Sequence, residues 1–304
     1  MERDERGTYD TANIMVTSLS RYIGDGMLVH VGTATFLGLV AAVLAKATHA
    51  PRADFRAMSG TGYYSEPFVV TLSLAEAMSL TIGPAERVTD AYTHVERDEG
   101  VDFEASVPAQ IDMYGNANLS IIGTDYDRPK VRLPGSAGLD SLPLMRHSKL
   151  RFYSTRHNTR TFVPKVDFIT GAGYLTGPGA REALGIRGDG GPGSVVTNLG
   201  VFDWDEATKR MRVVSLHPGV TSEQVRSNTG FEILGLDGRP PTTPLPTAEQ
   251  LDVIARIDPL GIRRLEFLEG SERRRVLREV LDAEARIALG RPNDAFRALA
   301  FRKS

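Results

Sequence analysis

A strand, a glycine turn and an apolar helix follow one another near the N-terminus, and this succession limits the fold more than any other feature. Residues 27–31 are apolar enough for a buried strand, Gly32 allows a turn, and residues 36–47 form an apolar helical segment. The longest apolar run in this helix has about half the length needed to cross a bilayer. Further apolar strand candidates alternate with helices, at residues 55–58, 117–122, 150–153, 165–169, 194–197 and 211–216. The pattern predicts an α/β protein with an open, mainly parallel sheet covered by helices.

The rest of the sequence predicts further helices, a glycine-rich segment and a proline-rich linker. Apolar residues at helical spacing predict helices at residues 12–24, 248–257 and 271–289, and helical stretches within residues 70–107. Residues 171–193 contain nine glycines, which predicts positive φ angles or close approach to another group, or else a flexible surface connection. Four prolines in residues 235–247 predict an extended linker.

Composition and charge exclude several kinds of site. The 304 residues carry a formal net charge of −2 and no cysteine, which excludes disulfides, thiolate metal sites and a cysteine nucleophile within the chain. Residues 271–304 hold nine Lys and Arg against five Asp and Glu, which we interpret as a solvated helix face or a surface for an acidic neighbour. The six histidines lack metal-binding spacing, and the charged N-terminus does not resemble a signal peptide. We expect a cytoplasmic protein with no metal site and no nucleic-acid or membrane partner.

The segment 112–138 has the composition of a ligand site. It ends in Gly135, Ser136, Ala137 and Gly138, whose small side chains let the backbone approach a ligand closely. Exposed N–H groups in such a loop can bind an oxyanion, whereas a tight turn without a ligand is the structural alternative.

Four polar residues precede this loop within the same segment. Lys130 and Arg132 alternate along the chain, so both can face one negatively charged ligand, or both can be surface charges. Asn116 and Asn118 also alternate, at the start of an expected strand. Their amides can orient a substrate or stabilise a turn, and the spacing does not decide between these roles.

Several motifs follow one another in order along the chain. They are Gly-Asn-x-Asn at residues 115–118, Arg-Pro-Lys-Val-Arg-Leu-Pro-Gly at 128–135, and the segments 166–170, 197–202, 215–221 and 228–231. Together they resemble the B (β) subunit of family I CoA-transferases, of the glutaconate CoA-transferase type. The resemblance covers residues 12–265, which implies one α/β domain with that superfamily's open fold. Residues 266–304 are then an appended helical extension.

The resemblance also implies a substrate and a partner. The loop 135–138 corresponds to the segment that lines the thioester site in this family. The substrate would be an acyl-CoA, so that coenzyme A enters as part of the substrate and no cofactor is permanently bound. The partner would be an A-type (α) subunit.

At the position of the family's nucleophile the sequence departs from the pattern. Transferases of this type carry a glutamate in a Glu-Ser-Gly step, whereas this chain has Met58-Ser59-Gly60 there. A thioether cannot form an acyl anhydride or a thioester. Glu66 is a nearby acid that can be tested as a substitute, and Tyr63 either lines an acyl pocket or packs in the core.

Three functions remain open at this point. Superfamily branches that lack the glutamate are implied to cleave a carbon–carbon bond of an acyl-CoA by hydrolysis or decarboxylation, which keeps the oxyanion loop and explains the missing acid. The first alternative is a CoA-transferase that moves CoA between carboxylic acids with a displaced nucleophile. The second is a non-catalytic scaffold protein within the complex.

Overall fold

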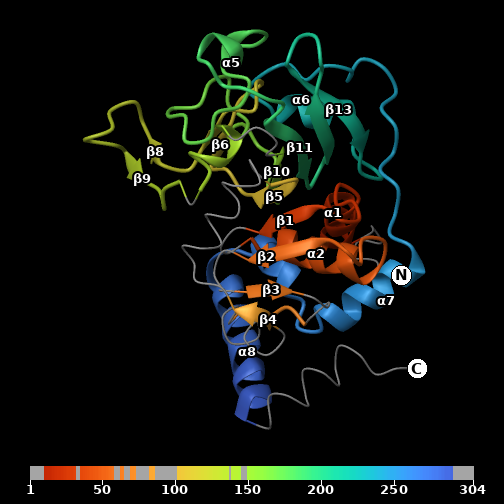
Figure 1. Ribbon diagram of the computed structural model, residues 1–304. Helices are drawn as coiled ribbons and strands as arrows, with labels where there is room; N and C mark the ends of the chain where they lie inside the picture. The colour runs from red at the N-terminus through yellow and green to blue at the C-terminus, as the bar shows by residue number, and fades with distance from the viewer. Residues whose placement is uncertain are drawn as a thin grey trace. The chain divides into compact units, whose positions relative to one another are not determined.

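A computed structural model gives the structure of the chain (Figure 1). It describes residues 10–31, 35–57, 62–64, 69–72, 82–85, 101–136, 138–144 and 149–289. The chain divides into two compact units, one of Met1–Thr93 with Leu245–Ser304 and one of His94–Pro244. The boundary at residue 265 between a family domain and an extension stays a prediction.

The first unit contains the predicted strand and helix, and the turn predicted at Gly32 lies outside the described residues. Its elements are α1 (Thr11–Ser20), β1 (Leu28–Val31), α2 (Phe36–Ala47), β2 (Asp54–Ala57), β3 (Gly62–Tyr64), β4 (Ile82–Ala85), α7 (Ala248–Ile257), the 3-10 helix η2 (Ile262–Phe267) and α8 (Gly270–Leu289). Strand β1 is parallel to β2, and β3 is antiparallel to both β2 and β4. Ten of the twelve residues of α2 are buried, as its apolar sequence predicts. α8 is the predicted C-terminal helix, and α1 ends before the predicted residue 24.

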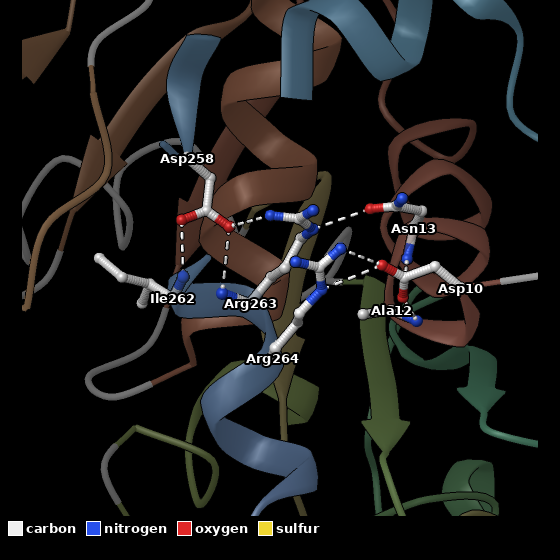
Figure 2. Close-up of polar contacts among 7 residues, drawn as sticks. All are labelled: Asp10, Ala12, Asn13, Asp258, Ile262, Arg263 and Arg264. Carbon is white, nitrogen blue, oxygen red and sulfur yellow. Dashed lines mark hydrogen bonds and ion pairs between the residues drawn. The ribbon is translucent and has the colours of Figure 1, made fainter. Parts of the chain in front are cut away.

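Polar contacts within this unit connect α1 to segments about 250 residues later in the sequence. The Asp10 carboxylate caps α1 by accepting from the Ala12 N–H at 2.9 Å. Figure 2 shows Arg263 between Asp258 and Asn13, with Nη1 2.7 Å from Asp258 Oδ2 and Nε 2.8 Å from Asn13 Oδ1. These bonds join η2, through Arg263, to α1 and to the C-cap residue of α7.

Within its described residues, the second unit contains five strands that pair in one sheet and two small hairpins. The strands are β5 (Phe103–Ser106), β10 (Lys149–Ser154), β11 (Gly191–Thr197), β12 (Gly200–Trp204) and β13 (Met211–Leu216). β10 is parallel to β5 and β11, whereas β12 is antiparallel to β11 and β13. The hairpins are β6 (Gln110–Ile111) with β7 (Ala117–Asn118), and β8 (Ile121–Ile122) with β9 (Val131–Arg132). The short helices are η1 (Leu142–Leu144), α5 (Ala180–Ala183) and α6 (Ser222–Ser227).

The predicted α/β fold is confirmed, and each unit contains both parallel and antiparallel strand pairs. Two strand predictions were wrong. Residues 165–169 form no strand, because the Asp167 N–H donates to the Gln110 side chain and not to a neighbouring strand. Residues 117–122 form two short strands in different hairpins, because Asn118 Oδ1 accepts from Ser120 and Ile121 and turns the chain.

Other segments of the prediction have mixed outcomes. Strand β5 lies inside the segment 70–107 that was predicted to have helical stretches, and the stretch around residues 75–78 lies outside the described residues. The prediction of an extended linker at residues 235–247 fails at its start, because residues 235–237 form a turn in which Gly235 has a φ of 84°. Further along, the Leu216 N–H of β13 donates to the Pro241 carbonyl at 2.9 Å, and the Thr243 N–H donates to the Leu216 carbonyl at 2.7 Å. Among the helices that the structure describes, none is both long and apolar enough to span a membrane.

The glycines of residues 171–193 take the special backbone conformations that their number predicted. Gly177, Gly179 and Gly191 have positive φ angles. Gly173 has another role, because a Cβ there would lie 2.3 Å from the carbonyl carbon of Gly115. This close approach brings the glycine-rich segment against the turn that precedes β7.

Candidate functional site

The Asn116 amide is fully bonded inside the second unit. Its Nδ2 donates to Asp112 Oδ2 at 2.9 Å and to the Leu175 carbonyl at 2.8 Å, and its Oδ1 accepts from the Gly173 N–H at 3.0 Å. Burial raises the pKa of Asp112, although the bonds from Asn116 oppose this shift. Asn116 therefore holds the glycine-rich segment against its own turn.

The Asn118 amide has a similar structural role. Its Nδ2 donates to Gln110 Oε1 at 2.7 Å and to the Ile121 carbonyl at 2.6 Å, while its Oδ1 accepts from Ser120 and Ile121. These contacts are those expected for the turn-stabilising alternative. A contact of either asparagine with substrate stays a prediction.

The candidate oxyanion loop is anchored at its entry to this same turn. The Leu133 N–H donates to the Ser120 carbonyl at 2.9 Å, and the Gly135 N–H donates to the Leu119 carbonyl at 3.0 Å. The Gly135 N–H is therefore occupied and unavailable to an oxyanion. On the exit side, the Leu139 N–H donates to the Ser136 carbonyl at 2.9 Å.

Two backbone donors of the loop have no partner among the described residues. Within the part of the chain that the structure describes, the N–H groups of Ser136 and Gly138 make no hydrogen bond. Both residues are half-buried, and Gly138 has a φ of 89°. A Cβ at Gly135 would meet no atom of the described residues within 4 Å, so these residues leave space open at this point of the loop. Available donors on an anchored, open loop suit an oxyanion that develops during a reaction. Ala137 lies outside the described residues.

Lys130 and Arg132 lie in the β8–β9 hairpin, which extends away from β10–β13 (Figure 1). Both are exposed, and Arg132 Nη2 donates to the Tyr126 carbonyl at 2.8 Å. The Arg132 guanidinium also lies 4.8 Å from the centroid of the Tyr126 ring. Lys130 makes no side-chain hydrogen bond or ion pair with the described residues. Binding of a substrate anion by these two cations stays a prediction.

The predicted nucleophile region is not described by the structure. Met58, Ser59, Gly60 and Glu66 all lie outside the described residues. Tyr63 lies in β3, where it pairs with Arg56 of β2, and its side chain is also undescribed. The roles of these residues stay predictions.

Sequence reasoning missed one residue of this site. Thr170 Oγ1 accepts from the Leu119 N–H at 2.9 Å and lies 2.7 Å from Ser120 Oγ, directly behind the anchoring turn. Thr170 could have been noticed because it ends the segment 166–170, which resembles the family. The sequence does not show which turn its side chain contacts.

Two buried histidines of this unit have structural roles. His157 Nδ1 lies 3.1 Å from Thr197 Oγ1, and its Nε2 lies 2.9 Å from Thr229 Oγ1. His217 Nε2 donates to the Thr197 carbonyl at 2.7 Å. Burial lowers the pKa of His157 to about 3 and that of His217 to about 4. Both rings are therefore neutral near pH 7.

Comparisons with known proteins place this geometry in context. The family model described as "Coenzyme A transferase" matches residues 13–228. The B-type subunit of glutaconate CoA-transferase from Acidaminococcus fermentans is 34% identical over 74% of this chain and 84% of that protein. The solved structure of glutaconate CoA-transferase from this organism superposes with a TM-score of 0.72 at 30% identity, covering 83% of this chain and 95% of that one.

Two other relatives have names that denote different reactions. The IpdB component of the cholesterol ring-cleaving hydrolase of Mycobacterium tuberculosis is 37% identical over 52% of this chain and 61% of that protein. The structure of the decarboxylase AibA/AibB matches with a TM-score of 0.67 at 26% identity, covering 84% of this chain and 97% of that one.

Proposed function

Because this chain belongs to the coenzyme A transferase family and is of the B-subunit type, we propose that it joins an A-type subunit to form an acyl-CoA enzyme. The proposed reaction cleaves a carbon–carbon bond of the acyl-CoA by hydrolysis or decarboxylation. Coenzyme A enters as part of the substrate. The names of the hydrolase and decarboxylase relatives support a reaction of this kind.

The observation that carries this proposal is the pair of N–H groups at Ser136 and Gly138, which bond to no described residue although their loop is anchored. When a carbon–carbon bond beside a thioester breaks, an enolate or a tetrahedral oxyanion forms at the carbonyl oxygen. Fixed donors bind this charge more strongly than they bind the neutral carbonyl, and so they lower the barrier. The donors then serve hydrolysis and decarboxylation equally.

The sequence at residues 58–60 argues against covalent transfer. Met58-Ser59-Gly60 offers no carboxylate to attack a thioester, and a thioether cannot replace one. The acid or base for cleavage would come largely from the A-type subunit. In this scheme the chain supplies oxyanion stabilisation and positions the thioester.

The first test uses the complex purified with its A-type subunit. The complex is incubated with a panel of acyl-CoAs, including 3-oxoacyl-CoAs and unsaturated or dicarboxylic acyl-CoAs, and the products are identified by mass spectrometry. We expect products in which a carbon–carbon bond is broken. Exchange of CoA onto added acetate, with a trapped enzyme–CoA adduct, would refute the proposal.

A matched pair of variants tests the loop itself. Ser136→Pro removes the N–H donor, whereas Ser136→Ala keeps it and removes only the hydroxyl. We expect Ser136→Pro to lower kcat about 100-fold to 1000-fold, as the loss of one oxyanion donor does in other enzymes. Ser136→Ala should retain nearly full activity. Equal effects of the two variants would show that the N–H is not used.

A second candidate function is CoA transfer between carboxylic acids. The name of the glutaconate CoA-transferase relative favours it, and Glu66 would be the nucleophile. Borohydride or hydroxylamine added during turnover would then modify Glu66, since only a glutamyl thioester leaves a changed carboxylate. A third possibility is a non-catalytic scaffold. Full activity after Gly135, Ser136 and Gly138 are replaced by bulky residues, with assembly intact, would favour it.

A further inference from the structure

Thr170 and Gly171 have a fixed backbone position beside strand β7. The N–H groups of Thr170 and Gly171 both donate to the Ala117 carbonyl at 2.9 Å, and the Ala117 N–H donates to the Gly171 carbonyl at 3.0 Å. The Thr170 side chain is buried, with 7% of its residue surface exposed. Its hydroxyl is thus held in one place relative to β7.

The Thr170 hydroxyl determines where the entry of the oxyanion loop is attached. It accepts from the Leu119 N–H at 2.9 Å and lies 2.7 Å from Ser120 Oγ. The carbonyls of the same two residues accept from Gly135 and Leu133, respectively. Thr170 therefore contacts both residues whose carbonyls bond to the loop, Leu119 through its N–H and Ser120 through its hydroxyl.

Gly171 contacts the exit of the same loop. A Cβ at Gly171 would lie 2.7 Å from Leu139 Cγ and 3.0 Å from the Leu139 carbonyl oxygen. The absence of a side chain lets Leu139 approach the Thr170–Gly171 backbone, and the Leu139 N–H holds the Ser136 carbonyl. The two adjacent residues thus contact both ends of the segment that carries the Ser136 and Gly138 donors.

We propose that Thr170 and Gly171 are positioning residues that hold the N–H groups of Ser136 and Gly138 in their reactive arrangement. Neither residue needs to touch the substrate. Thr170 acts through Leu119 and Ser120, and Gly171 acts through Leu139. This inference rests on the proposed function of the loop as an oxyanion site. It assigns a supporting role to Thr170 and Gly171, which lie more than 30 residues after the loop in the sequence.

The test compares Thr170→Val with Thr170→Ser in the complex with the A-type subunit. Valine has nearly the shape of threonine but cannot accept from Leu119, whereas serine keeps the hydroxyl. We expect Thr170→Val to lower kcat about 10-fold to 100-fold with little change in KM, since a small misplacement of reacting groups has effects of this size. Thr170→Ser should restore most of the activity.

A second measurement does not depend on turnover. Hydrogen exchange followed by mass spectrometry should show faster exchange in the peptides covering residues 133–139 of Thr170→Val, with the β10–β13 peptides unchanged. Gly171→Ala should loosen the same peptides from the exit side. Gly238→Ala is the control, since the nearest atom to its new Cβ is 3.8 Å away.

The outcomes separate this inference from the proposed function. Unchanged exchange at residues 133–139 in both Thr170→Val and Gly171→Ala would overturn the positioning role, whatever the enzyme does. Faster exchange with unchanged kcat on an active acyl-CoA substrate would overturn it also. If the wild-type complex consumes no acyl-CoA while exchange at the loop rises, the oxyanion function fails and the inference that depends on it fails with it.

Discussion

Replacement of Arg263 by methionine tests how α1 is held to η2 in the first unit. The Arg263 side chain is 6% exposed and that of its partner Asp258 is fully buried, with 2.7 Å between Arg263 Nη1 and Asp258 Oδ2. The same guanidinium donates to Asn13 Oδ1 in α1 at 2.8 Å, across 250 residues of sequence (Figure 2). Methionine preserves much of the side-chain volume but removes both contacts.

The expected loss follows from the burial of the remaining carboxylate. Removing one partner of a buried ion pair costs about 3–5 kcal/mol, because the other charge stays in a medium of low dielectric. Asp258 still accepts from the Ile262 N–H at 2.7 Å and from the residue 263 N–H at 3.2 Å. These two bonds place the expected loss in the free energy of unfolding at the lower end of that range, about 3 kcal/mol.

Arg264 provides the matched control. Its ion pair with Asp10 is 2.6 Å long, but its side chain is 44% exposed. An exposed pair of this kind contributes about 0–1 kcal/mol, so Arg264→Met should change stability by no more than that. Urea unfolding followed by circular dichroism measures both variants under identical conditions. Losses of similar size in the two variants would refute the reasoning from burial.

The pH dependence provides an independent check. Burial raises the pKa of Asp258 above its ordinary value, and Arg263 opposes the shift. In Arg263→Met the folded-state pKa should rise further, so that the folded protein binds a proton which the unfolded chain releases. The deficit relative to wild type should therefore shrink as the pH falls from about 7 toward about 5. A deficit that stays constant over this range would contradict a buried charge as its cause.

Two further predictions concern the second unit. Because burial lowers the pKa of His157 to about 3, the unfolded chain binds a proton below about pH 6.5 that the folded protein does not, and stability falls as the pH drops. His157→Gln should therefore reduce the slope of the unfolding free energy against pH, between about pH 6 and pH 5, by about 1.4 kcal/mol per pH unit. Urea titration at several pH values measures this slope. An unchanged slope would show that the ring is protonated in the folded protein. Gly173→Ala should cost about 1–3 kcal/mol or prevent folding, since its Cβ would lie 2.3 Å from a backbone atom of Gly115. Gly238→Ala, measured by the same thermal and urea unfolding, should change stability by less than about 0.5 kcal/mol, and a Gly173→Ala protein as stable as this control would contradict the close approach.

Local sequence patterns predicted much of the fold. The strand and helix expected at residues 27–31 and 36–47 are β1 and α2, and the helix expected at residues 248–257 is α7. Such elements depend on side-chain periodicity and on capping residues that are close in sequence. Residues 165–169 have the apolar composition of a strand but lack its hydrogen bonds, because a side chain from Gln110 takes the N–H that a strand partner would need.

Some features of the candidate site follow from the amino-acid sequence, and others follow only from the tertiary structure. The amino-acid sequence alone established the small-residue loop at 135–138 and the absence of a carboxylate at residues 58–60, since both are matters of residue type. Only the tertiary structure decided that the Gly135 N–H is occupied by Leu119, that no described residue takes the N–H groups of Ser136 and Gly138, and that Thr170 holds the turn behind them. The physical reason is that a hydrogen bond forms with whichever group lies within about 3 Å, and that neighbour is set by the folding of distant segments.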